Sequence, residues 1–410
     1  MGEDCQEALG PWPLSSSSNP RILIVAGEAS GDAHGARLVA AIKEQEPQAQ
    51  FFGVGGEALA AQGVRILCPA ADLAVVGLSE VMGKVPAVLR ALRDISRALR
   101  LERPRLVILV DFPDFNFWVA RLARYYRVPV MYYISPQVWA WRTYRVRTIA
   151  RLVDRMVVIF PFEADFYREK GVPVDYVGHP LRETLPPLPS RRDLIAGWDL
   201  DPERLTVALL PGSRASEIRR HLPLMLAGAA LIRKAIPGCQ FVLPLASTAP
   251  GELVTTMVAD FEKNLGEEAT DRQMLPPAFK IIAGQAYQAL AAAHLALVAS
   301  GTVTLEAALA GTPTIIVYRL SPLTFAVGRR LVRVEHVGMA NLLAGERLFP
   351  ELLQEDFTPE RLAREVLDLI KDGGRLKMMR QGMARIISSL GGPGASARAA
   401  EVALELMGSK

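Results

Sequence analysis

Residues 21–35 read RILIVAGEASGDAHG and form the first strand–turn–helix pattern of the chain. A short apolar run of this kind predicts a buried strand, and the small residues Gly27, Gly31 and Gly35 follow it closely. Glycines at a strand exit let the backbone approach a ligand, and the helix that follows presents free N–H groups. The pattern therefore predicts one repeat of a parallel α/β sheet, with a ligand site at the turn.

The same alternation of short β-rich runs and longer helical patterns continues through the chain. In the first half the further runs are QFFGVGG, RLVILVD, VPVMYYI, RMVVIF and VDYVG, and in the second half they are LTVALLPGS, CQFVLPLA, FKIIAG, HLALVAS and TPTIIVY. Four prolines between residues 179 and 189 separate the halves, as expected of a linker. We therefore expect an α/β fold with two Rossmann-like, doubly wound domains that face each other across a cleft.

These patterns predict four segments. Residues 1–20 are rich in Ser and Pro towards their end and lack the basic-then-apolar order of a signal peptide, so they are expected to form a disordered tail. The N-terminal domain is expected over residues 21–184 and the C-terminal domain over residues 185–356. After Phe357, Thr358 and Pro359 mark a helix start, and residues 357–410 are expected to form terminal helices.

The composition argues against a membrane-spanning or disulfide-rich chain. Half of the 410 residues are hydrophobic and the mean hydropathy is +0.19, but no apolar run reaches the roughly 18–20 residues that cross a bilayer. The three cysteines, Cys5, Cys68 and Cys239, show neither an even number nor a metal-ligand spacing. We therefore expect a soluble or peripheral protein of a reducing compartment.

Positive charge is concentrated in one part of the chain. The net charge is +4, but residues 84–155 hold one lysine and fourteen arginines against five acidic residues, a local charge of +10. Residues 84–100, KVPAVLRALRDISRALR, form an amphipathic pattern, and Arg147, Arg151 and Arg155 recur every four residues. This arrangement favours an anionic membrane surface as partner over nucleic acid.

Two acidic residues stand at predicted strand exits in the first half. Glu28 would repel a dinucleotide's pyrophosphate, so the turn favours a neutral, hydroxyl-rich ligand; alternatively, Glu28 and Ser30 only cap the helix. Asp111, in LVDFPDFNFW (109–118), is followed by aromatic residues that would raise its pKa by desolvation, which suits a general base. Asp114 and Asn116 are explained more simply as turn and cap residues.

The second half carries two further motifs at strand exits. LLPGSRASE (209–217) combines a glycine turn, a helix start and an arginine, which together predict an anion site for a diphosphate. LVASGTVTLE (297–306) repeats the helix start, and its final carboxylate is placed to accept hydrogen bonds from ribose hydroxyls. The predicted nucleotide-binding residues are Gly212, Ser213, Arg214, Ser300, Gly301, Thr302 and Glu306.

Signatures of metal, kinase and hydrolase chemistry are weak. The one D-x-D match, at residues 199–201, lies in the linker turn and is expected to be solvated, so we expect no catalytic metal and no cofactor. The sequence shows no Walker pattern and no Ser/His/Asp order. His294 lies on an apolar stretch and is interpreted as a core residue, whereas His179 either lines the cleft or belongs to the hinge.

Eight short motifs, in this order, resemble the lipid-A-disaccharide synthase family: AGEASGD, VDFPDFN, SPQVWAWR, FPFE, VGHPL, LLPGSR, SGTVTLE and NLLAG. The resemblance runs from about Arg21 to the C-terminus. It implies a glycosyltransferase of the GT-B type and importance for Glu28, Asp111, Arg214 and Asn341. It also implies dimers with exchanged C-terminal segments, so the terminal helices are expected to pack back on the N-terminal domain or on a partner subunit.

The resemblance implies transfer of 2,3-diacylglucosamine from UDP-2,3-diacylglucosamine to 2,3-diacylglucosamine 1-phosphate, giving a β-1,6 disaccharide and UDP. The reaction would be inverting and metal-independent, in the cytoplasm at the inner membrane. The C-terminal domain would bind the UDP-sugar, together with Asn341, and the N-terminal domain would bind the acceptor and face the membrane. Asp111 and Glu28 would be catalytic, and the acceptor side would include Ser30, Asn116, Trp139, Trp141 and His179.

The alternatives are another UDP-sugar enzyme of the same fold and a non-catalytic protein that binds sugar nucleotides or lipids. A UDP-N-acetylglucosamine epimerase and a peptidoglycan glycosyltransferase are examples of the first, and the SPQVWAWR and VDFPDFN motifs argue against both. The role of the tryptophan pair also stays open. Trp139 and Trp141 are either interfacial anchors or packing residues beneath the acceptor site.

Overall fold

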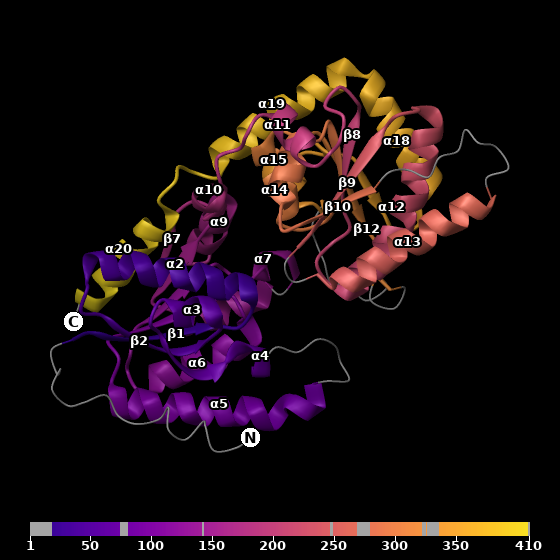
Figure 1. Ribbon diagram of the computed structural model, residues 1–410. Coiled ribbons are helices and arrows are strands. Elements are labelled where there is room, and N and C mark those ends of the chain that lie inside the picture. The colour runs from indigo at the N-terminus through magenta and orange to yellow at the C-terminus, as the bar shows by residue number, and fades with distance from the viewer. Residues whose placement is uncertain are drawn as a thin grey trace. The chain divides into compact units, whose positions relative to one another are not determined.

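The computed structural model describes residues 19–73, 81–141, 143–246, 249–268, 279–321, 325 and 336–408. The chain divides into two compact units (Figure 1). Unit 1 takes the described residues up to Thr184 and those from Leu390 on, and unit 2 runs from Leu185 to Ser389. Each unit is one parallel sheet with helices on both faces, so the predicted α/β class with two doubly wound sheets is confirmed.

Within the described residues, the sheet of unit 1 has seven strands in the order β3-β2-β1-β4-β5-β6-β7. The order reverses between β1 and β4, which are paired from Ile22–Leu106 to Ala26–Val110. Doubly wound sheets bind ligands at such a switch point, outside the carboxyl ends of the strands. The strands are β1 (Arg21–Ala26), β2 (Gln50–Gly55), β3 (Arg65–Pro69), β4 (Leu106–Val110), β5 (Val130–Tyr133), β6 (Arg155–Val158) and β7 (Val174–Tyr176).

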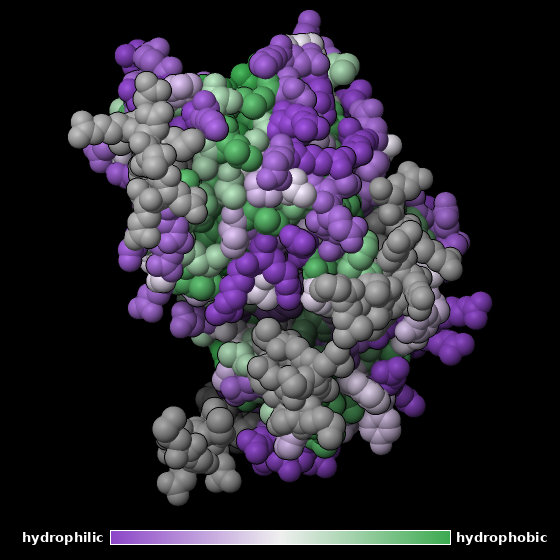
Figure 2. All heavy atoms as spheres, turned by 90° about the vertical axis from the view of Figure 1, so that its right-hand side faces the viewer, coloured by the Kyte–Doolittle hydropathy of each residue, from purple (hydrophilic) through white to green (hydrophobic). Residues whose placement is uncertain are grey.

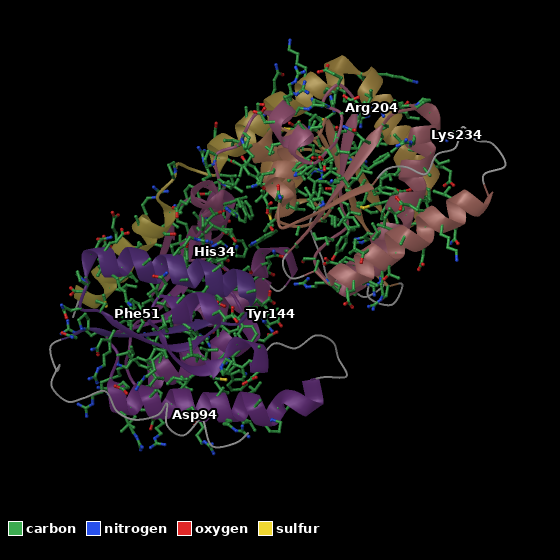
Figure 3. The ribbon with its side chains drawn as sticks, viewed as in Figure 1. His34, Phe51, Asp94, Tyr144, Arg204 and Lys234 are labelled. Carbon is green, nitrogen blue, oxygen red and sulfur yellow. The ribbon has the colours of Figure 1, made fainter. Side chains whose placement is uncertain are left out.

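Helices cover both faces of this sheet. In Figure 1, α2 (Ala29–Gln45) and α20 (Ala395–Gly408) run along one face, and α5 (Val81–Glu102) and α6 (Pro113–Tyr125) along the other. Because β1 and β4 are buried on both faces, they are continuous apolar runs. Phe51 lies inside this core, whereas Asp94 lies on the outer helix α5 (Figure 3). The other helices are α3 (Glu57–Ala61), α4 (Ala70–Leu73), α7 (Val138–Trp141), α8 (Val146–Leu152), α9 (Pro161–Glu169) and α10 (Leu181–Thr184).

In the part of unit 2 that the structure describes, the sheet has six strands in the order β10-β9-β8-β11-β12-β13, with its switch point between β8 and β11. The strands are β8 (Thr206–Leu210), β9 (Gln240–Leu245), β10 (Phe279–Ala283), β11 (Leu295–Ala299), β12 (Thr314–Tyr318) and β13 (Glu351–Leu353). The helices are α11 (Arg191–Gly197), α12 (Ala215–Ala235), α13 (Gly251–Glu268), α14 (Ala286–Ala292), α15 (Val303–Ala310), α17 (Met339–Ala344), α18 (Pro359–Lys371) and α19 (Gly373–Ser389). Helices α12 and α13 cover one face, and α14 and α15 the other (Figure 1).

The three helices after Phe357 belong to different units. Helix α18 packs on α12, where the Leu362 side chain fills the space beside Gly228, and α19 packs on α15 and α17. Helix α20 packs on α2 of unit 1. The return to unit 1 therefore begins at Leu390, and α20 is the helix that makes it.

The surface carries polar and apolar residues side by side. On the face drawn in Figure 2, hydrophobic residues form a band in the upper part, flanked by hydrophilic ones. Among the helices that the structure describes, none is long and apolar enough to cross a membrane.

Candidate active site

Glu28 and Asp111 meet at the switch point of unit 1. Strands β1 and β4 are parallel neighbours, and their last paired residues are Ala26 and Val110. The residues that follow, Gly27–Glu28 and Asp111, therefore leave the sheet side by side. The negative charge of Glu28 is one of the causes that raise the pKa of Asp111. The structure thus brings the two predicted catalytic residues together.

The Asp111 carboxyl group has the electrostatics of a general base. It is half-buried, and its pKa is raised from 3.8 to about 6, first by desolvation and second by the charge of Glu28. A hydrogen bond from the Phe112 backbone acts in the opposite direction. At neutral pH the group is therefore mostly ionised, yet it is a stronger base than an exposed aspartate.

The start of α2 gives the Glu28 carboxylate no structural task. Glu28 is the N-cap residue, but its side chain makes no capping hydrogen bond, and both Glu28 and Ser30 are exposed. The buried acid of this helix is Asp32, which accepts hydrogen bonds from the backbone N–H groups of Gly56 at 2.6 Å and Ala58 at 2.9 Å. Asp32 therefore ties α2 to the start of α3, and Glu28 remains available to a ligand.

Asn116 lies in the wall behind this site. Its side chain is fully buried, and Nδ2 donates to the carbonyl oxygens of Asp111 at 2.6 Å and Val110 at 3.3 Å. The amide therefore holds the exit of β4 in place. We therefore interpret Asn116 as a residue that supports the backbone of the site, and not as one that contacts the acceptor directly.

Trp139 is fixed by a buried acid. Its indole Nε1 donates to Glu163 Oε1 at 3.1 Å, and its ring stands edge-on to Phe162 with the centroids 4.9 Å apart. Glu163 is only 2% exposed, and burial raises its pKa to about 7. These contacts favour the packing interpretation for Trp139. Trp141 ends α7, and its side chain lies outside the described residues.

His179 lies where the chain leaves and re-enters unit 1. Its ring Nδ1 accepts from the backbone N–H of Leu181 at 3.1 Å, and its own backbone N–H donates to the carbonyl of Leu390 at 2.9 Å. Burial lowers its pKa to about 3, and the nearby His34 of α2 (Figure 3) adds to this effect. Because the ring is buried and its Nδ1 is already bonded within unit 1, these contacts favour the hinge interpretation over contact with the acceptor.

In unit 2, the glycine turn after β8 is occupied by a carboxylate of the chain itself. Gly212 has a φ of 118°, and the backbone N–H groups of Ser213 and Arg214 donate to Glu217 Oε2 at 3.2 and 3.5 Å. The exposed guanidinium of Arg214 lies 3.6 Å from Glu217 Oε1. The turn thus has the geometry of an anion site, with Glu217 in the place of the anion.

The second helix start of unit 2 follows β11, the strand paired with β8. Gly301 and Thr302 are exposed, and the Ser300 hydroxyl donates to the carbonyl of Val337 at 2.7 Å. Burial raises the pKa of Glu306, whose carboxylate has no hydrogen bond or ion pair within the described part of the chain. A desolvated acceptor without a partner suits the hydroxyl groups of a ribose.

Asn341 is fully engaged within unit 2. It is completely buried, and its Nδ2 donates to the carbonyl of Phe349 at 2.8 Å and to Glu351 Oε1 at 2.9 Å. Its Oδ1 accepts from the backbone N–H of Phe349 at 2.8 Å. The side chain therefore closes the loop between α17 and β13, and its effect on a nucleotide site is indirect.

Sequence reasoning missed His221, which joins two strand exits of unit 2. Its buried ring donates from Nδ1 to the Pro211 carbonyl at 2.8 Å and accepts at Nε2 from the Arg319 backbone N–H at 3.0 Å. Burial lowers its pKa, which keeps the ring neutral. The sequence did hold one signal for it: Glu217 and His221 lie four residues apart, so they share the face of α12 that begins at the glycine turn.

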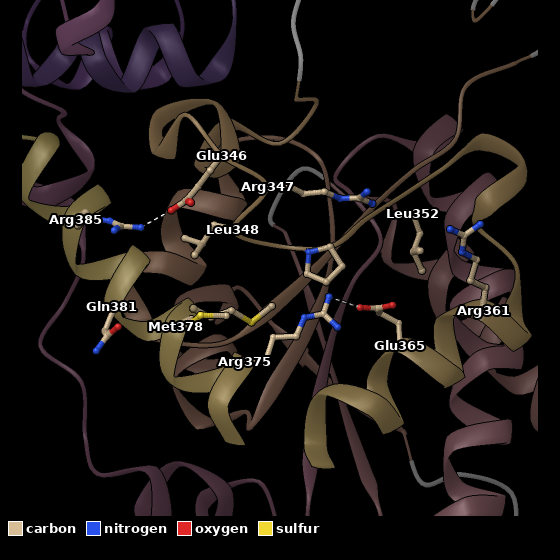
Figure 4. Close-up of a pocket in the computed structure, with 12 residues that line it drawn as sticks. Glu346, Arg347, Leu348, Leu352, Arg361, Glu365, Arg375, Met378, Gln381 and Arg385 are labelled. Atoms are coloured by element: carbon tan, nitrogen blue, oxygen red, sulfur yellow. Dashed lines mark hydrogen bonds and ion pairs between the residues drawn. The ribbon is translucent and has the colours of Figure 1, made fainter. Parts of the chain in front are cut away.

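The described residues of unit 2 line at least two cavities. One, of about 520 Å³, lies after the ends of β12 and β13, and Arg220 and Arg319 line it. The other, of about 570 Å³, lies beside α18 and α19 (Figure 4), where Arg375 pairs with Glu365 and Arg385 with Glu346. None of the predicted site residues lines either cavity, so we assign neither cavity to the site.

The described residues contain no group of three or more His, Cys, Asp or Glu side chains that could hold a metal ion. The D-x-D turn lies at the surface of unit 2, where Asp199 pairs with Lys280 and Asp201 with Arg204. The nearby His294 is half-buried and accepts from the Thr206 backbone N–H at 3.0 Å. These residues serve local structure.

Comparison with solved structures identifies the fold. The chain is similar to UDP-N-acetylglucosamine 2-epimerase from Neisseria meningitidis, solved with bound UDP-N-acetylglucosamine, with a TM-score of 0.61, 13% identity and coverage of 94% of this chain and 100% of that one. It is also similar to the calicheamicin glycosyltransferase CalG4, with a TM-score of 0.58, 17% identity and coverage of 95% and 99%. Identities this low show the fold alone, which is of the GT-B type.

Comparison of sequences identifies the family. The model of the lipid-A-disaccharide synthetase family matches residues 22–406. The lipid-A-disaccharide synthase of Geobacter metallireducens is 44% identical over 397 residues, which cover 97% of this chain and all of the relative. That of Myxococcus xanthus is 46% identical over 388 residues, with coverage of 95% and 98%. The resemblance carried by the eight motifs is confirmed, and the chain belongs to the lipid-A-disaccharide synthase family of glycosyltransferases.

Proposed function

We propose that this chain transfers 2,3-diacylglucosamine from UDP-2,3-diacylglucosamine to 2,3-diacylglucosamine 1-phosphate, forming the β-1,6 disaccharide phosphate and UDP. The reaction inverts the anomeric carbon and needs no metal ion. Membership of the family supports the substrates. One observation carries the mechanism. At the switch point of unit 1, the carboxylate of Glu28 lies near the desolvated carboxyl group of Asp111 and raises its pKa.

Unit 2 is the proposed binding site of the UDP-sugar. Its two helix starts flank the switch point between β8 and β11, where doubly wound sheets bind ligands. The diphosphate faces the turn at residues 212–214, and the ribose hydroxyls donate to the carboxylate of Glu306. Several neighbours of the same fold were solved with such ligands, among them the epimerase from Neisseria meningitidis.

Asp111 of unit 1 is the proposed general base. The 6-hydroxyl oxygen of the acceptor attacks the anomeric carbon of the donor, its proton passes to the Asp111 carboxylate, and the bond from the sugar to UDP breaks. General-base assistance of this kind contributes about 100- to 10,000-fold to the rate. Glu28 keeps the pKa of Asp111 raised and accepts a hydrogen bond from an acceptor hydroxyl.

Arg214 is the proposed counter-charge for the leaving UDP. Its guanidinium is exposed and sits directly at the helix start of α12, where backbone N–H groups also favour negative charge. A preorganised donor of this kind contributes on the order of 3 kcal/mol when negative charge develops. The chain's own groups therefore supply the stabilisation that other enzymes obtain from a metal.

The acceptor half is proposed to lie on the cytoplasmic face of the inner membrane. Large apolar side chains of unit 1 are exposed on two helices that contact each other, Leu89 of α5 by 62% and Trp118 and Tyr125 of α6 by 56% and 79%. The guanidinium of Arg121 lies over the Trp118 ring, 4.9 Å from its centroid. Apolar side chains interleaved with arginines suit an anionic lipid surface.

A dimer with exchanged C-terminal segments is also proposed. Helix α20 is attached to unit 1 by bonds at its start, where Glu183 accepts from the backbone N–H of Ser396 at 3.0 Å and from its hydroxyl at 2.9 Å. At its other end Glu405 pairs with Arg155. The same contacts can form between two chains, because residues 390–394 precede the helix as a connection without regular structure.

One incubation tests the reaction. The purified chain is mixed with both acylated substrates, and disaccharide phosphate and UDP are quantified with and without EDTA. We expect both products in equal amounts and the same rate with EDTA. UDP or an epimerised sugar nucleotide without disaccharide would contradict the transfer, and a loss of rate that added metal restores would contradict the metal-independent mechanism.

A further inference from the structure

The exit of β4 has a constrained backbone. Asp111 and Phe112 have φ values of 46° and 48°, and within the described residues this is the one place where two adjacent non-glycine residues adopt left-handed angles. Left-handed backbone angles are sterically unfavourable for a residue that has a Cβ atom. A non-glycine residue therefore keeps these angles only where the surrounding structure holds it in place. Some part of unit 1 must therefore maintain the conformation of the proposed base.

Two buried donors converge on the carbonyl oxygen of Asp111. Nδ2 of Asn116 and the hydroxyl of Tyr132 each lie 2.6 Å from it. Both side chains are completely buried. Burial raises the pKa of Tyr132 well above its ordinary value, so this hydroxyl stays protonated and donates at any pH at which the protein is folded.

The ring of Phe112 packs at the same junction, against the exit of β1. A Cβ placed on Gly27 would come within 2.1 Å of this ring, so the ring packs directly on the backbone at the exit of β1. The ring also contacts Phe115, with the centroids 5.5 Å apart. The strand exits that carry Glu28 and Asp111 are therefore packed against each other without space for a further side chain at position 27.

We propose that Tyr132 and Asn116 are positioning residues that hold Asp111 in its left-handed conformation, so that its carboxylate stays beside Glu28 at the switch point. The inference rests on the proposed function, because it assigns to Asp111 the role of the base. Neither residue touches the reacting atoms. Each acts through the Asp111 carbonyl, which two donors keep turned into the protein.

The consequence of losing the donors follows from the geometry. Without them the backbone of Asp111 relaxes to an ordinary conformation, and the direction of its Cα–Cβ bond changes. The carboxylate then moves away from the acceptor hydroxyl and towards water. A displacement of about 1 Å at a reacting group costs on the order of 100-fold in rate.

The first test compares Tyr132→Phe with Tyr133→Phe. Both tyrosines are completely buried on β5, but consecutive strand residues point to opposite faces, and the Tyr133 hydroxyl lies near Arg37 and Glu183 instead. We expect Tyr132→Phe to lower kcat about tenfold with an unchanged KM for the UDP-sugar, since one donor remains. Tyr133→Phe should keep the wild-type kcat.

The second test removes both donors. In Tyr132→Phe combined with Asn116→Ala, we expect kcat to fall on the order of 100-fold. UDP binding, measured by titration calorimetry, should not change, because the nucleotide site belongs to unit 2. Circular dichroism and thermal unfolding show whether the double variant is folded, and Tyr132→Phe alone carries the comparison if it is not.

The pH profile separates positioning from a purely structural role. The groups that act on Asp111 are Glu28 from the start of α2 and the Phe112 backbone, and its carbonyl accepts from Tyr132 of β5. The charge of Asp114 of α6, which is paired with Arg145, acts on Tyr132. Wild-type kcat/KM should fall below about pH 6, where Asp111 becomes protonated. In the double variant this limb should move to lower pH, because the carboxyl group becomes solvated.

Each outcome decides one claim. A Tyr132→Phe variant with wild-type kcat, or a double variant with an unshifted acid limb, would overturn the positioning role. The proposed function fails separately, if Asp111→Asn retains turnover or if no disaccharide forms. Loss of activity in Asp111→Asn together with normal activity in Tyr132→Phe would therefore reject the inference and leave the base in place.

Discussion

Asp111 shows how a single residue is kept reactive at the expense of stability. Its pKa rises from 3.8 to about 6 on folding, so the native state binds its proton more tightly than the unfolded chain does. Such a group contributes fully to stability below pH 3.8, and its contribution is lost as the pH rises through about 6. At neutral pH the ionised carboxylate therefore destabilises the fold by about 3 kcal/mol.

Asp111→Asn should consequently abolish turnover and stabilise the protein at the same time. The neutral amide mimics the protonated acid, so unfolding in urea at pH 8 should require about 3 kcal/mol more than in the wild type, while the two proteins should be equal at pH 3.5. Asp114→Asn is the matched control, because the Asp114 side chain is 75% exposed on the next turn. Equal stability of Asp111→Asn and wild type at pH 8 would contradict the raised pKa.

At the scale of elements, the sequence was sufficient for the strands and for the residues at their exits. Apolar runs such as LVILV predicted β4, and Asp111 and Glu28 were found because a strand end and its next residue are visible in a linear pattern. The sequence did not reveal which side chains hydrogen-bond to these strand exits. In the sequence Tyr132 is only a strand residue, and the order of the strands brings its hydroxyl to the Asp111 carbonyl. Glu217 is only a helix residue, and the geometry of the turn brings its carboxylate to the glycine turn.

The terminal helices show the same limit. The pattern of α18 predicts that one face is buried, but not which element covers it. The cover is α12, because Gly228 leaves space there for Leu362. A linear pattern contains no information about that space, so the return of the chain to unit 1 at Leu390 rather than at residue 357 followed only from the packing.

The turn before α12 leads to a prediction about UDP affinity. The Glu217 carboxylate occupies the N–H groups of Ser213 and Arg214, where the diphosphate is proposed to bind, so the nucleotide must displace it. Glu217→Gln keeps an acceptor oxygen for the turn but removes the competing charge. We expect UDP to bind about tenfold more tightly, a change of about 1.4 kcal/mol, in titration calorimetry.

Two comparisons make that experiment decisive. Glu217→Gln should leave the unfolding free energy nearly unchanged, whereas Glu217→Ala should lose about 1 kcal/mol through the missing cap. Raising the ionic strength should narrow the difference in affinity between wild type and Glu217→Gln, since the competition is electrostatic. Weaker UDP binding by Glu217→Gln would instead mean that the carboxylate serves to orient Arg214.

At the scale of the whole molecule, the exposed apolar residues of unit 1 are proposed to hold the enzyme at the membrane from which the acceptor enters the site. Diacylated sugars reside in a membrane, so an enzyme that acts on them gains from a surface that holds it there. Helix α5 offers Val85 and Leu89, exposed by 46% and 62%, beside arginines such as Arg93, exposed by 76%. Apolar burial and attraction to anionic headgroups then act together.

Leu89→Glu should therefore weaken binding to vesicles that contain anionic lipid on the order of 100-fold, because it removes about 2 kcal/mol of apolar burial and adds one repelled charge worth about 1 kcal/mol. Met378→Glu is the matched control, since Met378 is equally exposed, by 62%, but lies on α19 of unit 2. Vesicle co-sedimentation measures binding, and turnover of detergent-dispersed substrates tests whether the site is intact. Equal loss of vesicle binding in both variants would show that the attraction to the membrane is not specific to α5. If only Leu89→Glu loses vesicle binding and keeps its turnover in detergent, the membrane contact is separate from the chemistry at Asp111.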